Sequence, residues 1–331
     1  MVMPPRLPRM GEFELIARHF TRAAPAGGAV VLGVGDDCAL LQPTPGHQLA
    51  ISSDMLVEGR HFFAGAEPEA LGHKALAVNL SDLAAMGARP LGFTLALALP
   101  AADEAWLAPF ARGLLALADA QACPLVGGDT TRGPLTISLT VFGEVLPGRA
   151  LRRNAARAGD DLWISGCTGE ARLALALRRG EPWARGDLAE VQERMDRPMP
   201  RLALGQALAA TEGVRAALDV SDGLLGDLGH ILKASGVGAE IETAALPLAP
   251  ALRALDDQHR LDCLLAGGDD YELLFTADAS AHEAVLAAGT ASATAVTCIG
   301  RITPADGGML VLDRDGTPLP LARHGFDHFA D

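Results

Sequence analysis

The sequence has few aromatic residues and no paired cysteines. Aromatic side chains make up 4% of its 331 residues. Its five cysteines stand apart without a CxxC pair, which excludes a zinc site of that kind and favours reduced thiols over a disulfide framework. Alanine, leucine and glycine dominate the chain instead. This composition is typical of a packed α/β or α+β protein and excludes a disordered one.

Positive charge is scarce as well. The chain has 27 basic and 41 acidic residues, a formal net charge of −14. Proteins that bind nucleic acid without sequence preference need basic patches, so we expect no nucleic-acid partner. If the substrate is a phosphate ester, metal cations have to supply the local positive charge.

Long hydrophobic runs are absent. The longest uncharged apolar stretch, residues 91–102, is shorter than the ~20 residues that span a bilayer. The first residues, MVMPPRLPRMGEFE, lack the apolar run of a secretory signal. We therefore expect a soluble cytoplasmic protein with no membrane partner.

The known phosphate-binding loops are missing too. The sequence has no GxxxxGK[ST] pattern, which excludes a P-loop. Gly33-Val34-Gly35 begins like a dinucleotide fingerprint, but the third glycine is missing and two aspartates follow. Those carboxylates would repel a bare pyrophosphate, so a Rossmann site is excluded.

What the chain has is a set of aspartates beside glycine, serine or threonine. Carboxylates flanked by small residues let the backbone approach a ligand closely, and such hard oxygen ligands hold Mg²⁺, which usually sits on phosphates. Each one alone is also typical of a turn or a helix cap. Asp82 differs, because it stands in an apolar helical segment where a buried carboxylate needs a partner. The candidate ligands are Asp37, Asp54, Asp82, Asp129, Asp219 and Asp222.

Three other polar residues have two readings each, and a fourth has one. Arg153 is either a bidentate phosphate clamp or a solvated linker charge. His61 either contacts a substrate phosphate or is an ordinary surface or core histidine. The Ser221 hydroxyl either reaches a phosphate or caps the helix that follows. Lys74 is expected to be a solvated helix residue.

Two domains are expected, because single cores stop growing near ~250–300 residues. The basic, irregular segment 147–160 places the boundary, giving domains 1–148 and 149–331. Helices are predicted at 12–19, 67–86, 103–120 (capped by Asp103), 169–179, 198–211 and 224–235. Strands are predicted at 30–33, 48–53, 91–99, 135–145, 161–165, 217–220, 271–276 and 297–302. The second strand is predicted to end at Asp54, and Gly127-Gly128-Asp129 to leave a short strand, Leu125-Val126. No simple doubly wound alternation is visible.

The ordered segments resemble the thiamine-monophosphate kinase family, within the aminoimidazole-ribonucleotide-synthetase-like ATP-binding superfamily. The resemblance runs from Gly11 to Phe329. It is carried by GVGDDCALL (33–41), HKALAVNLSDLAAMGARP (73–90), GGDTTRGPL (127–135), DVSDGLLGDLGHI (219–231) and GGDDYELLFT (267–276). It implies an amino-terminal ATP- and Mg²⁺-binding domain whose mixed sheet joins its mate in a homodimer. A carboxy-terminal α/β domain completes the two-domain α+β fold.

The resemblance also implies an activity, namely phosphorylation of thiamine monophosphate to thiamine diphosphate by ATP, the final step of thiamine diphosphate synthesis. Direct in-line transfer is the simplest mechanism, and it needs no general base because the attacking phosphate oxygen is already ionised. The implied Mg²⁺ ligands are Asp37, Ser52, Ser53, Asp54, Asp82, Asp129, Asp219 and Asp222. Gly128, Asp129, Arg153 and Ser221 would contact ATP. His61, Asp269 and Phe326 would contact thiamine monophosphate. Asp129, Asp219 and Asp222 would carry catalysis.

One departure and three alternatives accompany this interpretation. The family often has glutamate where this chain has Asp269. An ATP-dependent ligase of purine synthesis shares the superfamily fold. A selenophosphate synthetase also shares it, but nothing like its reactive cysteine and glycine-rich lysine loop precedes Gly33. A non-catalytic nucleotide-binding regulator is the alternative from a different class.

Overall fold

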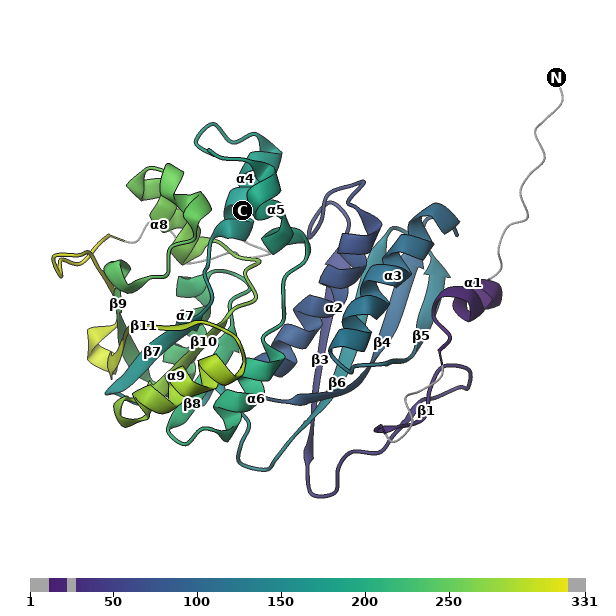
Figure 1. The fold of residues 1–331 in the computed structure, drawn as a ribbon, viewed down its shortest axis with the longest axis horizontal. Helices are drawn as coiled ribbons and strands as arrows, with labels where there is room; N and C mark the ends of the chain where they lie inside the picture. Colours follow the sequence, from purple (N-terminus) through teal and green to yellow (C-terminus); the bar gives the residue numbers. More distant parts are fainter. Residues whose placement is uncertain (1–11, 23–27, 321–331) are drawn as a thin grey trace. The chain divides into compact units, whose positions relative to one another are not determined.

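A computed structural model describes residues 12–22 and 28–320 (Figure 1). The chain divides into two compact units, residues 1–79 with 90–144 and residues 80–89 with 145–331. The predicted division after residue 148 lies close to the start of the second long segment. Grouping of residues 80–89 with the second unit was not expected.

The first unit contains a four-stranded sheet in the order β3-β6-β4-β5. Its strands are β3 (Gln48–Val57), β4 (Arg89–Leu99), β5 (Leu125–Arg132) and β6 (Thr136–Val145), and β4 runs parallel to β5. The helices α2 (Pro68–Ala85) and α3 (Glu104–Ala120) lie along this sheet (Figure 1). A short helix, α1 (Glu12–His19), and an antiparallel pair, β1 (Val30–Leu32) and β2 (Leu40–Leu41), complete the unit.

The core of the first unit follows the two-residue period of its strands. Phe93 and Leu95 of β4 are buried, as are Ile137 and Leu139 of β6, because alternate side chains of a strand share one face. The two long helices pack closely on each other. A Cβ added to Gly113 of α3 would lie 1.9 Å from the carbonyl oxygen of Glu69 on α2, so only glycine fits at this crossing.

The second unit is built on a six-stranded sheet in the order β12-β9-β11-β7-β10-β8. Its strands are β7 (Asp160–Ser165), β8 (Val214–Asp219), β9 (Val237–Glu242), β10 (Leu273–Asp278), β11 (Val296–Pro304) and β12 (Met309–Leu312). The pairing of β12 with β9 is parallel, and the other pairings are antiparallel. This mixed sheet agrees with the predicted α+β class.

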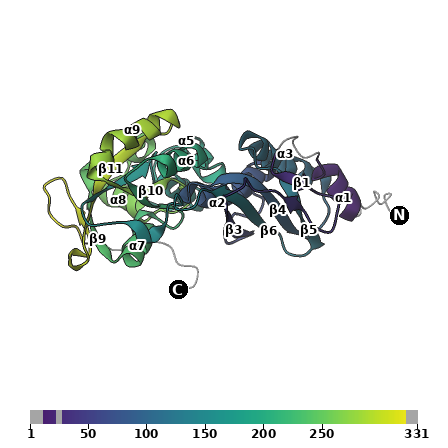
Figure 2. The same ribbon diagram turned by 90° about the horizontal axis from the view of Figure 1, so that it is seen from below.

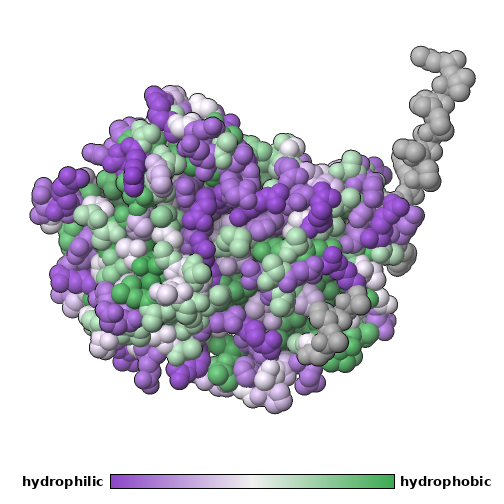
Figure 3. Space-filling model, viewed as in Figure 1, coloured by the Kyte–Doolittle hydropathy of each residue, from purple (hydrophilic) through white to green (hydrophobic). Residues whose placement is uncertain are grey.

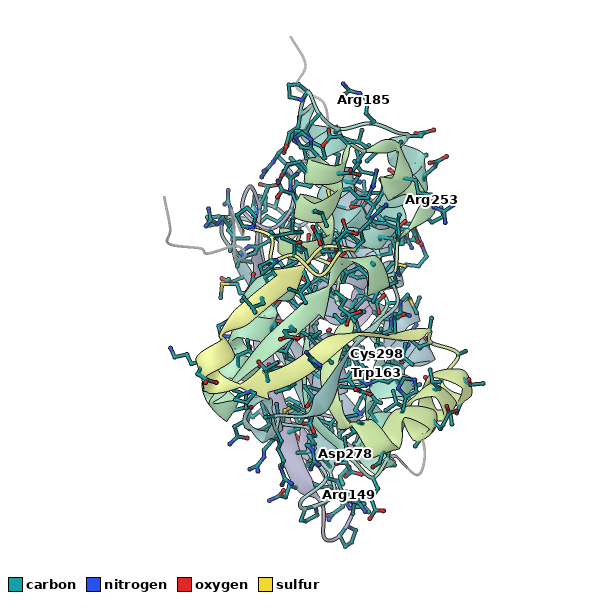
Figure 4. The ribbon with its side chains drawn as sticks, turned by 90° about the vertical axis from the view of Figure 1, so that its left-hand side faces the viewer. Arg149, Trp163, Arg185, Arg253, Asp278 and Cys298 are labelled. Atoms are coloured by element: carbon teal, nitrogen blue, oxygen red, sulfur yellow. The ribbon has the colours of Figure 1, made fainter. Side chains whose placement is uncertain are left out.

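The helices of the second unit are α4 (Glu170–Arg179), α5 (Leu188–Asp196), α6 (Leu202–Ala210), α7 (Leu224–Ser235), α8 (Asp257–Ala266) and α9 (His282–Ala291). Helices cover both faces of this sheet, and Figure 2 shows α7 and α9 on opposite sides of it. Leu162 and Ile164 of β7 face a core shared with α4, α5, α7 and α8. Trp163 faces the other way and stacks on Phe275 with ring centroids 6.2 Å apart. It also pairs in register with Cys298 of β11 (Figure 4). Short 3-10 turns are η1 (Arg153–Ala155), η2 (Thr243–Ala245), η3 (Pro250–Ala254), η4 (Ala279–Ala281) and η5 (Ala305–Gly307).

Two local predictions were wrong, and both concern aspartates. Strand β3 does not end before Asp54 but continues to Val57. The short strand Leu125-Val126 does not end before Gly127-Gly128-Asp129, because that segment lies inside β5 and pairs with β4. In both places pairing with a neighbouring strand outweighs the local preference of glycine and aspartate for turns. Helices α5, α8 and α9 and strands β2, β9 and β12 were not predicted.

Some surface properties are plain. None of the described helices is long and apolar enough to cross a membrane. All five cysteines are free thiols, as predicted. The face drawn in Figure 3 mixes hydrophilic and hydrophobic residues, with hydrophobic colour near β1 at the lower right. Val31 of β1 and Leu40 of β2 are both exposed.

Candidate functional site

Two candidate aspartates of the first unit are open to solvent. Asp37 follows β1 in a turn, and its backbone amide donates to a carboxylate oxygen of Asp36 at 2.8 Å. Asp129 lies on β5 with its side chain exposed. Both carboxylates are therefore accessible to a ligand that arrives from solvent.

Gly128 precedes Asp129 at a position that admits no side chain. Its φ is +149°, and a Cβ there would lie 1.9 Å from the carbonyl oxygen of Leu95 on β4. Because β5 is an edge strand, the bare backbone at Gly128 is exposed. A bulky anionic ligand can approach such a backbone closely.

Strand β3 places its three candidate ligands on two faces. Ser53 lies on the side of Thr140, with its hydroxyl 3.0 Å from the Thr140 hydroxyl and donating to the Leu139 carbonyl at 2.9 Å. Ser52 and Asp54 alternate with Ser53 and so face the other side. The side chains of these three residues therefore do not converge.

An amide that the sequence analysis did not assign holds Asp54 in place. The side-chain oxygen of Asn79, on α2, accepts the backbone amide of Asp54 at 3.0 Å. Its side-chain nitrogen donates to the Ala75 carbonyl at 2.9 Å. The Asn-Leu-Ser-Asp run of α2 was the signal, but the spacing alone did not show that Asn79 bonds to β3. Lys74 of the same helix is only 5% exposed, so the expectation of a solvated lysine was wrong.

His61 has its ring orientation fixed by the backbone. Its Nδ1 accepts the backbone amide of Val57 at 2.9 Å, so that nitrogen carries no proton. In the neutral ring Nε2 then carries the proton and acts as a donor. This tautomer suits a contact with a phosphate oxygen.

In the second unit, Asp82 and Asp219 are electrostatic neighbours. Asp219 ends β8 and is 6% exposed. Burial raises its pKa to about 7, and the negative charge of Asp82 adds to the shift. Two carboxylates placed in this way repel each other unless a cation binds between them.

A second buried carboxylate, Asp227, organises the loop after β8. One of its oxygens accepts the backbone amides of Ser221, Asp222 and Gly223 at 3.0, 3.0 and 3.1 Å. Burial nevertheless raises the pKa of Asp227 to about 7. Asp227 was not among the predicted site residues, although an acidic residue in the first turn of a helix is a recognisable signal. Ser221 and Asp222 owe their backbone positions to it.

Arg153 lies exposed on η1, and its backbone is tied to the end of α7. The Ser235 hydroxyl donates to the Arg153 carbonyl at 2.8 Å and accepts the Ala156 amide at 3.2 Å. The η1 segment is thereby fixed while the guanidinium group stays at the surface. This arrangement fits an anion contact.

The remaining predicted residues lie in or beyond the segment 267–272. Asp269 is half-buried in the loop before β10. Phe326 lies outside the described residues. Within the described ranges, no three His, Cys, Asp or Glu side chains are grouped closely enough to hold a metal ion. The roles assigned to these individual residues therefore stay predictions.

Comparison with known proteins places the chain among named relatives. Residues 35–145 match the model of the AIR synthase related protein, N-terminal domain, and residues 157–313 match its C-terminal domain. A protein of Salmonella typhimurium named thiamine-monophosphate kinase is 46% identical over 323 residues, covering 97% of this chain and 98% of the relative.

Solved structures agree with these matches. The crystal structure of thiamine-monophosphate kinase from Stenotrophomonas maltophilia K279a is similar with a TM-score of 0.81 and 46% identity, covering 89% of this chain and 93% of that one. The structure named "AaThiL complexed with AMPPCP and TMP" has a TM-score of 0.73 and 28% identity, covering 99% of this chain and 100% of that one. The similarity thus extends over both units.

Proposed function

This chain belongs to the thiamine-monophosphate kinase family, and we propose on that premise that it transfers the γ-phosphate of ATP to thiamine monophosphate. The products are ADP and thiamine diphosphate. The observation that carries the proposal is similarity over nearly the whole chain to proteins of that name. A relative with AMPPCP and TMP bound supports the same pair of ligands.

The chemistry is an in-line displacement at phosphorus. A phosphate oxygen of thiamine monophosphate forms a bond to the γ-phosphorus of ATP, and the bond from that phosphorus to the bridging oxygen of the β-phosphate breaks. The nucleophile is ionised at neutral pH, so no side chain has to remove a proton. The main obstacle is repulsion, since two like charges 4 Å apart cost ~4 kcal/mol at an effective dielectric near 20.

Mg²⁺ fits the chemistry of the donor set. The pair Asp82 and Asp219 gives the most direct support for a bound cation. The negative charge of Asp82 raises the pKa of Asp219, and a hard cation relieves that repulsion. Bound Mg²⁺ would neutralise the phosphates and stabilise charge in the transition state. The residues that would hold it are Asp37, Ser52, Ser53, Asp54 and Asp129 in the first unit and Asp82, Asp219 and Asp222 in the second.

The remaining residues would bind the two substrates. We assign Gly128, Asp129, Arg153 and Ser221 to ATP, which agrees with the bare backbone at Gly128 and the exposed guanidinium of Arg153. We assign His61, Asp269 and Phe326 to thiamine monophosphate. His61 presents a donor nitrogen, and Asp269 presents a carboxylate suited to a cationic or N–H-bearing ring. Asp129, Asp219 and Asp222 would have the largest effect on turnover.

A homodimer and a cytoplasmic location complete the proposal. Leu49, Ile51 and Met55 all project from the open face of β3 and are 52, 60 and 55% exposed. An apolar row on an edge strand favours association with another copy. This row supports the proposed joining of amino-terminal sheets between two copies.

The test is an incubation of the purified protein with ATP, Mg²⁺ and thiamine monophosphate, with the products separated by chromatography. We expect thiamine diphosphate to form one-for-one with ADP, and not to form when Mg²⁺ is removed with a chelator. ADP without thiamine diphosphate would point to the purine-type ligase. Nucleotide binding without any turnover would point to a regulator, and either result would refute the kinase assignment.

A further inference from the structure

The loop that carries Asp269 alternates its polar side chains between the interior and an open side. Asp270 accepts the backbone amide of Gly169 at 2.9 Å. Glu272 is 1% exposed and bonds to the guanidinium groups of Arg194 and Arg201. The Ser165 hydroxyl also donates to Glu272. These contacts of Asp270 and Glu272 hold the loop against the interior of the second unit.

The two residues that alternate with these anchors along the chain have an unusual backbone. Asp269 and Tyr271 have φ values of +68° and +51°, in the left-handed region that costs free energy for any residue except glycine. Their amides are both held, because Asp269 donates to the Ser221 carbonyl and Tyr271 to the Val220 carbonyl, each at 2.8 Å. A strained conformation that is fixed on several sides is typical of a functional position.

The same two side chains bond to each other. The Tyr271 hydroxyl donates to an Asp269 carboxylate oxygen at 3.0 Å. Tyr271 is the only tyrosine of the chain. A carboxylate accepts through two oxygens, so a bond that fixes one of them also fixes the direction of the other. The left-handed backbone at both positions is what turns the two side chains toward each other.

We propose that Tyr271 is a positioning residue that aims the Asp269 carboxylate at the organic ring system of thiamine monophosphate. This inference rests on the proposed function, which assigns Asp269 to that substrate. Tyr271 acts through Asp269 and makes no contact with the reacting phosphates.

The first experiment removes the hydroxyl alone. Tyr271→Phe keeps the ring and the backbone preference of the residue. We expect the KM for thiamine monophosphate to rise about tenfold, as for loss of a hydrogen bond to a charged acceptor. The kcat and the KM for ATP should stay within about twofold. Thr290→Val is the matched control, because it deletes one hydroxyl that bonds only within α9, and it should change none of these values.

A double-mutant cycle then tests whether Tyr271 acts through Asp269. Asp269→Gly removes the carboxylate without strain, since glycine accepts a φ of +68°. In this background Tyr271→Phe should raise the KM less than about twofold further. A tenfold rise in both backgrounds, or no rise in the wild-type background, would refute the positioning role and leave the kinase intact. A wild-type protein that neither binds nor phosphorylates thiamine monophosphate would refute the proposed function and this inference with it.

Discussion

The carboxylates of the two units differ most in their contact with water. In the first unit, Asp37 and Asp129 are exposed. In the second unit, Asp219 and Asp227 are 6 and 4% exposed, and burial raises the pKa of each to about 7. An exposed aspartate costs nothing to keep charged until a ligand arrives. A buried one carries a standing penalty that a cation or a set of amide donors has to offset.

The two kinds of site therefore suit different tasks. The exposed aspartates can exchange ligands quickly, because a cation displaces only water from them. Asp219 is buried and its neighbour Asp82 is half-buried, and this pair gains most from a cation, since binding removes a repulsion that already exists. Asp227 uses its charge differently, for it accepts three backbone amides and shapes the loop of Ser221 and Asp222.

The largest loss of turnover should come from Asp129→Asn and Asp219→Asn. Loss of a metal-binding carboxylate should lower kcat about 100-fold or more, which corresponds to ~2.7 kcal/mol or more in the barrier. The two variants should differ in stability. At pH 8, Asp129→Asn should leave the melting temperature unchanged, whereas Asp219→Asn should raise it because a buried charge is removed. Full activity in Asp129→Asn would disprove the metal role of the Gly127-Gly128-Asp129 segment.

Asp227→Ala should destabilise the protein by about 2 kcal/mol, because three amides lose their common acceptor. Urea unfolding at pH 7 would measure the change. Asp227→Asn is the matched control, since its side-chain oxygen can still accept the amides. If the alanine variant is as stable as the asparagine variant, the three bonds contribute nothing to folding.

The pH dependence of stability should have a defined sign. The folded pKa of Asp227 is about 7, above the ~3.9 of an unfolded aspartate. The folded state therefore binds protons more tightly. The stabilisation of the folded state by protonated Asp227 is fully present below about pH 4 and is lost as pH rises through 7. Melting temperatures recorded without Mg²⁺ should fall between pH 5 and pH 8, and Asp227→Asn should flatten the fall. An equal slope in the variant would show that Asp227 does not titrate in this range.

The smallest loss of stability should come from Asp103, an exposed aspartate that, like Asp227, accepts a backbone amide near the start of a helix. Asp103 caps α3 by accepting the Ala105 amide at 3.0 Å, and Asp103→Ala should cost about 1 kcal/mol. Asp103→Ser, which keeps a capping oxygen, should cost less. Urea unfolding of both variants beside Asp227→Ala would show whether burial makes the same kind of bond more valuable. Equal losses of unfolding free energy in Asp103→Ala and Asp227→Ala would show that burial does not strengthen this kind of hydrogen bond.

Much of the secondary structure could be predicted from local sequence. The Asp103 cap and the bounds of α1, α3 and α7 follow from signals within a few residues of each other. The missed elements have weaker local signals. Strand β12, for example, is four residues long and exists through its parallel pairing with β9.

The sequence alone determined the family, the fold class and the identity of the candidate aspartates, because these depend on residue types and their order along the chain. Only the tertiary structure decided that Asp54 and Asp129 lie within strands, that Ser53 faces away from Asp54, and that Asp82 lies close enough to Asp219 to raise its pKa. It also decided that the Tyr271 hydroxyl donates to Asp269 and that both residues have a left-handed backbone. Caps and helical periods act between near neighbours, whereas strand pairing, burial and charge coupling depend on residues far apart in the chain that meet only after folding.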